Sequence, residues 1–142
     1  MSVHEEELEE LKKRFIISED EERAMLKDIL TRIMSYAKVF KNGYVHIEKR
    51  NLSKRLKILL AVMARYVAGL LDESISKEIS LDEIVAITGA SKKEASARLS
   101  EFIKEGLITR TEKGKYRATS LHAAEELLDI LERKEKRDGD KG

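Results

Sequence analysis

The chain has 142 residues, about one ordinary domain in length. It has no cysteine, which excludes disulfides, zinc fingers, iron–sulfur sites and thiol nucleophiles, and 39% of its residues are charged although the net charge is only +1. The absence of Pro and the many Lys and Glu residues are typical of intracellular proteins of heat-loving microbes. The acidic N-terminus does not resemble a signal peptide, and the longest apolar stretch, around residues 58–64, is too short to span a bilayer. We therefore expect a cytoplasmic protein.

The first 50 residues are expected to form an N-terminal helical extension with a possible role in dimerisation. Residues 5–13 predict a short charged helix, with Leu8 and Leu11 on one side. Ser18 and Glu21 have capping-box spacing and open a stronger helix, about residues 19–38. Its apolar residues recur at steps of three and four: Leu26, Ile29, Leu30, Ile33, Met34 and Ala37.

A turn at residues 41–43 ends this second helix. Residues 44–47 fit either a short strand or an extended connector. The helix over residues 52–71 is the most hydrophobic of the chain, and its apolar side chains cover more than one face, so we expect it to be central. Residues 72–78 are polar and loop-like, and Ile79 adds one short strand.

Two further serines begin the next helices. Ser80 and Glu83 have capping-box spacing, as do Ser91 and Glu94. The first of these helices ends at Gly89, a residue suited to the left-handed conformation that often follows a helix. The second ends at Gly106.

A basic hairpin follows, in which residues 107–111 and 116–119 flank a bend at Gly114. The last helix covers residues 121–133, and the charged tail beyond it is expected to fray. The predicted fold is mainly α with a small β-hairpin, divided into residues 1–50, 51–120 and 121–142.

Charge alternates along the chain. Residues 31–70 carry 9 Lys/Arg and 1 Asp/Glu, a net of +8, and residues 91–120 carry 8 and 4, a net of +4. The segments 1–30, 71–90 and 121–142 carry −5, −4 and −2. A nearly neutral molecule can in this way present a basic face to phosphates.

The order of helix, short strand, helix, tight turn, helix and basic hairpin resembles the winged helix-turn-helix DNA-binding regulators related to the MarR and ArsR families. The resemblance covers about residues 52–120. It is carried by LDEIVAITG at 81–89, SKKEASARL at 91–99, FIKEGLI at 102–108 and KGKY at 113–116.

The resemblance implies that the helix over about residues 91–105 enters the major groove of double-stranded DNA, and that the wing over about residues 108–119 reaches an adjacent phosphate strand. Ala97 departs from the family pattern, because many relatives carry a long polar or arginine side chain at this position. Its methyl group offers only an apolar contact to thymine. Arg98 is the best candidate for a guanine contact. The side chains expected on DNA are Ser91, Lys92, Lys93, Ser96, Arg98, Arg110, Lys113, Lys115 and Arg117.

Most of these residues also have a plainer interpretation. Ser91 is first of all a helix cap, and the cations of the wing fit an ordinary soluble hairpin. Lys92 and Lys93 fit a solvated helix start, and Arg98 fits a surface pair with Asp82 or Glu101. The basic run over residues 49–57 is equally compatible with flanking phosphate contacts and with a solvated helix entrance. The three histidines are scattered and predict no metal site.

The hypothesis drawn from the sequence is a homodimeric, sequence-specific transcriptional regulator that binds double-stranded DNA. Its dimer would be built chiefly from the helices at 19–38 and 121–133, unless their apolar stripes pack within one chain. The alternative is a winged-helix protein-interaction module in a transcription or replication complex. The chain shows no phosphate-binding glycine loop, no Ser/His/Asp set and no paired catalytic carboxylates, so we expect no enzyme and no cofactor, and no effector pocket can be recognised.

Overall fold

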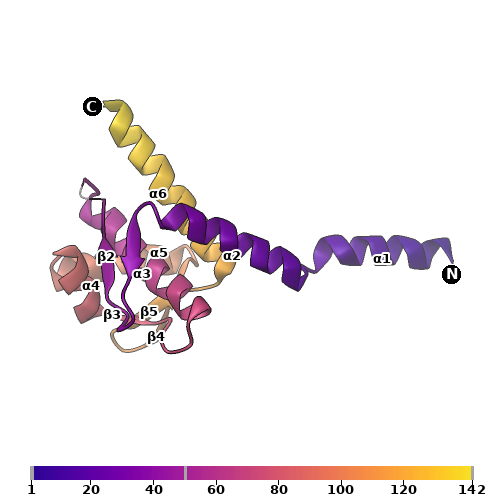
Figure 1. The fold of residues 1–142 in the computed structure, drawn as a ribbon, viewed down its shortest axis with the longest axis horizontal. Helices are drawn as coiled ribbons and strands as arrows, with labels where there is room; N and C mark the ends of the chain where they lie inside the picture. The colour runs from indigo at the N-terminus through magenta and orange to yellow at the C-terminus, as the bar shows by residue number, and fades with distance from the viewer. Residues whose placement is uncertain (1, 50, 142) are drawn as a thin grey trace.

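The computed structural model describes residues 2–49 and 51–141, with side chains as far as residue 134. The chain is mainly helical with small antiparallel sheets, as the sequence predicted (Figure 1). The elements, in order, are α1 (Val3–Phe15), α2 (Glu19–Ile33), β1 (Ala37–Val39), β2 (Val45–Ile47), α3 (Lys54–Leu71), β3 (Ile79–Ser80), α4 (Leu81–Thr88), α5 (Lys92–Lys104), β4 (Ile108–Glu112), β5 (Lys115–Ala118) and α6 (Leu121–Lys141).

Helix α3 carries the core, as its apolar composition predicted. Every residue from Ile58 to Val67 is buried, so no face of its middle turns reaches water. The helix contacts α2, α4, α5, α6 and the strands β1, β2, β3 and β5. Ser53 caps its start by accepting a hydrogen bond from the amide of Leu56 at 3.3 Å.

Two small sheets flank this helix. Strands β1 and β2 form an antiparallel hairpin, with Lys38 opposite His46. Strands β3, β5 and β4 form a second antiparallel sheet in that spatial order, because β5 pairs with β3 on one side and with β4 on the other. Residues 44–47, which the sequence left open, therefore include a strand.

The predicted helix over residues 19–38 is too long. It ends at Ile33, and Ala37 lies in β1, where it faces the core opposite Ile47. The error has a physical reason. Ala37 comes one helical turn after Ile33, so it fits the helical spacing, but the same side chain can also face the core from a strand. At the other end of the chain α6 continues to Lys141, beyond the predicted end at residue 133.

Helices α2 and α6 pack on each other and on α3 within one chain. Most of each stripe is covered there, with Ile29, Leu127 and Leu131 all at 0% exposure, but Met34 at the end of the α2 stripe is 55% exposed. Arg32 of α2 joins the two helices, because its guanidinium lies 2.8 Å from Glu132 and 2.6 Å from Asp129 of α6. Hydrogen bonds to these two carboxylates raise the pKa of Arg32. Apart from Met34, these stripes are largely covered within one chain.

Arg65, on α3, is a buried cation that the sequence reasoning missed. Its side chain is 5% exposed and donates to the carbonyl oxygen of Gly43 at 2.6 Å, to that of Glu78 at 2.9 Å and to the carboxylate of Glu83. It therefore fixes the β1–β2 turn, the residue before β3 and the start of α4 to the same point of the central helix.

Candidate nucleic-acid interface

Helices α4 and α5 are joined by a turn of three residues, 89–91. Gly89 adopts φ +75°, a left-handed conformation that favours glycine, and Ser91 caps α5 by accepting from the amide of Glu94 at 3.1 Å. An ion pair of 3.1 Å between Asp82 and Lys92 links the starts of the two helices. The serine caps at Ser80 and Ser91 are confirmed. Of these two, the cap of Ser80 also has the reciprocal bond with Glu83 that completes a capping box, whereas the cap of Ser91 does not.

The inner face of α5 consists of Ala95, Leu99 and Phe102, all at 0% exposure. The opposite face follows from helical spacing at i, i+4, i+7 and i+11, and all four of its side chains are exposed. Its members are Lys93, Ala97, Ser100 and Lys104. We call these four residues the outer face of α5. It has two small residues in the middle and a lysine at each end, about 16 Å apart along the axis.

Only Lys93 of the five predicted contacts at the start of α5 belongs to this outer face. Ser91 is occupied as the helix cap, and Ser96 is half-buried. Arg98 lies on the flank, where its guanidinium is 2.9 Å from Glu101. The helical period of the sequence would have identified Ser100 and Lys104, which the prediction omitted.

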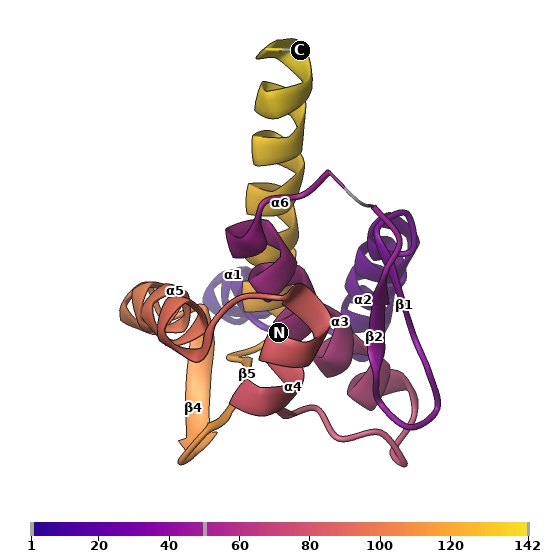
Figure 2. The same cartoon turned by 90° about the vertical axis from the view of Figure 1, so that its left-hand side faces the viewer.

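The β4–β5 hairpin is short and attached to the body. Its tip is held by a hydrogen bond of 2.9 Å from the amide of Leu81 to the carbonyl oxygen of Gly114. Strand β3 pairs with β5 as far as Lys115, and Glu112 of β4 pairs with the same residue, so only residues 113 and 114 extend past the sheet. Figure 2 shows α5 and β4 side by side at one edge of the molecule, with the hairpin tip below the helix.

The sheet places the four cations of the hairpin on different faces. Residues opposite each other in an antiparallel pair share a face. Arg110 stands opposite Tyr116, whereas Arg117 stands opposite Thr109 on the other face. Lys115 pairs with Glu112 at 3.2 Å, and this hydrogen bond raises the pKa of the lysine. Lys113 is exposed at the bend.

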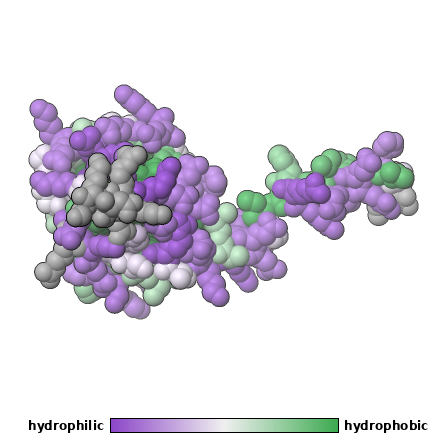
Figure 3. All heavy atoms as spheres, turned by 90° about the horizontal axis from the view of Figure 1, so that it is seen from above, coloured by the Kyte–Doolittle hydropathy of each residue, from purple (hydrophilic) through white to green (hydrophobic). Residues whose placement is uncertain are grey.

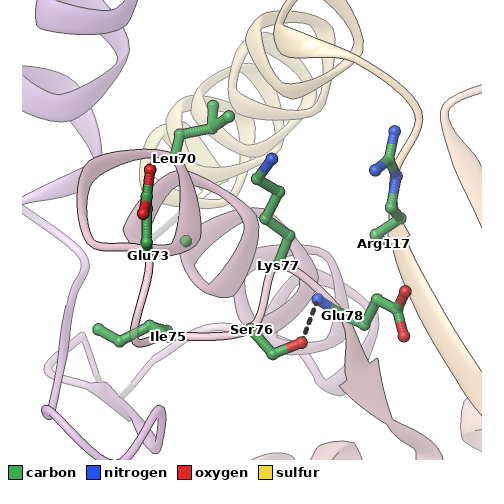
Figure 4. Close-up of a pocket in the computed structure, with 8 residues that line it drawn as sticks. Leu70, Glu73, Ile75, Ser76, Lys77, Glu78 and Arg117 are labelled. Atoms are coloured by element: carbon green, nitrogen blue, oxygen red, sulfur yellow. Dashed lines mark hydrogen bonds between the residues drawn. The ribbon is translucent and has the colours of Figure 1, made fainter.

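Arg117 does not join the outer face of α5. Its guanidinium lies over the ring of Tyr66, 5.7 Å from the centroid. It also lines an open, mainly polar groove of about 500 Å³ beside the end of α3, together with Lys77 and Glu78 (Figure 4). Both signs of charge line that groove.

Apart from Arg117, the cations of α5 and of the hairpin form two groups according to their acidic neighbours. Lys92, Arg98 and Lys115 each have a carboxylate within 4 Å. Among residues 2–49 and 51–134, none lies within ion-pair distance of Lys93, Lys104, Arg110 or Lys113. We call this second group the unpaired cations.

Two cations of the basic run over residues 49–57 lie over aromatic rings of the body. Lys49 lies over the ring of Tyr36, and Arg55 lies over that of Phe102, 4.8 Å from the centroid and 3.8 Å from Glu101. Arg50 lies outside the described residues. Arg55 thus supports the packing of α5 on α3.

Within the described residues, no group of three or more His, Asp or Glu side chains is placed to hold a metal ion. No described helix is long and apolar enough to cross a membrane. No known protein family, curated protein or solved structure matches the chain.

Proposed function

We propose that residues 52–120 form a winged helix-turn-helix domain that binds double-stranded DNA as a transcriptional regulator, with α5 as the recognition helix and β4–β5 as the wing. The outer face of α5 carries this proposal, because it presents two lysines without acidic partners on an exposed helix. The order α3, β3, α4, α5, β4, β5 and the sheet order β3-β5-β4 support the same assignment.

The composition of the face indicates how such a helix would bind. Ala97 and Ser100 are small, so the backbone of α5 can approach the groove closely, while Lys93 and Lys104 reach phosphates at either side. Arg98, held beside Glu101, would have to give up that ion pair to read guanine. We therefore expect phosphate contacts to dominate affinity and base readout to be modest.

A fluorescence anisotropy titration on labelled genomic duplex fragments at 50 and 200 mM salt tests this proposal. The variant K93A/K104A removes both end lysines. The matched control K27A/K41A removes two exposed lysines from α2 and the β1–β2 turn. We expect wild type and control to bind alike, and K93A/K104A to lose about tenfold in affinity at low salt, with a salt slope lower by about 2.

Absence of binding at 50 mM salt would contradict the proposal, as would equal losses in the two double variants. Absence of DNA binding would favour the second candidate function, a protein-interaction module. That candidate is supported by the three predicted cations whose charge is balanced by Asp82, Glu101 and Glu112.

A further inference from the structure

Helix α1 is an amphipathic helix that packs on no other helix or strand in the described part of the chain. None of its residues is buried, and it extends away from the body of the molecule (Figure 1). Leu8, Leu11 and Phe15 recur at steps of three and four, so they share one face, and they are 66%, 58% and 88% exposed. Figure 3 shows apolar surface along this projecting arm.

The sequence nevertheless specifies this helix. Ser2 and Glu5 form a complete capping box, with acidic residues in the first turn and basic residues in the last. A helix of 13 residues is marginal in water without tertiary contacts. An apolar stripe on a helix with its own cap indicates a surface that becomes buried in an assembly.

We propose that this surface binds α1 of a second copy of the chain, with the two helices antiparallel about a two-fold axis between Leu8 and Leu11. In this arrangement Leu8 of each copy packs on Leu11 of the other, and Phe15 packs beside His4. The interface is self-complementary, as a two-fold axis requires.

The distribution of charge along α1 favours a second copy of the same helix as the partner, in antiparallel orientation. The first part of the helix carries Glu5, Glu6, Glu7, Glu9 and Glu10, and the last turn carries Lys12, Lys13 and Arg14. An antiparallel pair sets each acidic half against a basic half. Beside the stripe, Glu7 meets Arg14 of the second copy on one side, and Glu5 meets Lys12 on the other. A parallel pair would instead set five glutamates beside five glutamates.

The same charges argue against other surfaces. Residues 3–15 carry five acidic and three basic side chains, so the helix would be repelled by anionic lipid and by DNA. Three apolar side chains from each copy make a small interface. We therefore expect a weak dimer, with a dissociation constant on the order of 10 μM.

Sedimentation velocity of the full chain without DNA, from 1 to 300 μM, tests the pairing. We expect wild type to pass from monomer to dimer over this range. The single variants E7K and R14E each set like charges together in a homodimer, so each should dimerise at least tenfold more weakly. A 1:1 mixture of the two restores opposite charges at both contacts, so the mixture should dimerise close to wild type.

Controls come from the opposite side of the same helix. E6K and K13E make equal charge changes away from the stripe and should leave dimerisation unchanged. Because α1 has no buried residue, every variant should keep the melting temperature of the body. Circular dichroism checks that temperature and the helix content.

A wild type that stays monomeric at 300 μM would overturn the proposal. So would a dimer that is insensitive to E7K and R14E, or a mixture no stronger than the single variants. The proposal does not depend on DNA binding, because the assay contains no DNA and α5 is unchanged. A chain that stays monomeric but binds DNA would refute the α1 dimer and leave the proposed function unchanged.

Discussion

Replacing Arg65 with methionine tests how much the hydrogen bonds of this buried arginine stabilise the fold. The change keeps a long side chain in the core but removes the charge and three hydrogen bonds. The carbonyl oxygens of Gly43 and Glu78 lose this donor, and the carboxylate of Glu83 loses its cation. Unlike a surface arginine, Arg65 is only 4% exposed, so water cannot readily replace these bonds.

The magnitude follows from burial. Two carbonyl oxygens packed against Arg65 lose their donor, at about 1–3 kcal/mol each, whereas the carboxylate of Glu83 is 44% exposed and adds less. We therefore expect a loss of about 2–5 kcal/mol from the free energy of unfolding. The matched control is Arg98→Met, which breaks the surface pair with Glu101. Its side chain is 42% exposed, so the loss should be below about 1 kcal/mol. Urea titrations followed by circular dichroism give both values. Equal losses, or a loss below about 1 kcal/mol for Arg65→Met, would refute the reasoning.

The same pair predicts a dependence on pH. Burial by itself would raise the pKa of Glu83, but hydrogen bonds from Arg65 and from the amide of Ser80 outweigh it and lower the pKa. A carboxylate with a lowered pKa stabilises the fold above its unfolded pKa, and this contribution is lost as pH falls through the folded value. In Arg65→Met the hydrogen bond from Arg65 is lost while the effect of burial and the bonds from Ser80 remain. The pKa of Glu83 should therefore be higher than in the wild type. We therefore expect the difference in stability between wild type and Arg65→Met to narrow below about pH 4; a constant difference from pH 7 to 3 would contradict this.

Three further changes test local packing through the same urea titrations. Gly69→Ala should lower the free energy of unfolding by about 2 kcal/mol, because the new Cβ would lie 2.6 Å from Cγ and 2.8 Å from the backbone nitrogen of Lys77. An increase of about 1 kcal/mol would instead mean that the higher helix propensity of alanine outweighs this clash. Ser80→Ala should cost about 1 kcal/mol by removing the cap bond to the amide of Glu83, and no change would show that water replaces it. Leu128→Ala, at 0% exposure, should cost about 2–5 kcal/mol, and a loss below about 1 kcal/mol would mean that the core closes around the cavity.

Much of the fold could be predicted because its signals are local. The starts of the helices after Ser18, Ser80 and Ser91 depend on a side chain three residues from the amide it caps. The central position of α3 follows from apolar residues on all its faces. The end of α2 was missed because Ala37 is buried by contacts with Ile47, which lies on another strand.

The candidate interface was less predictable than the fold. Residue type singled out Lys92 and Arg98, and each has an exposed acidic partner. The pair of Arg98 with Glu101 was one of the two that the sequence offered, but the pair of Lys92 with Asp82 was not. Helical period, used more strictly, would have indicated the outer face of α5 with Ser100 and Lys104. Arg65 has no local signal, because its acceptors lie on the β1–β2 turn, before β3 and on α4.

The central position of α3 also has a consequence for synthesis on the ribosome. The helix is complete once Leu71 has been made, but the α6 residues that cover one of its sides end at Leu131, near the end of the chain. At about 5–20 residues per second, the roughly 60 residues between them take about 3–12 s. Through that interval the nascent chain holds its most apolar helix without its final cover.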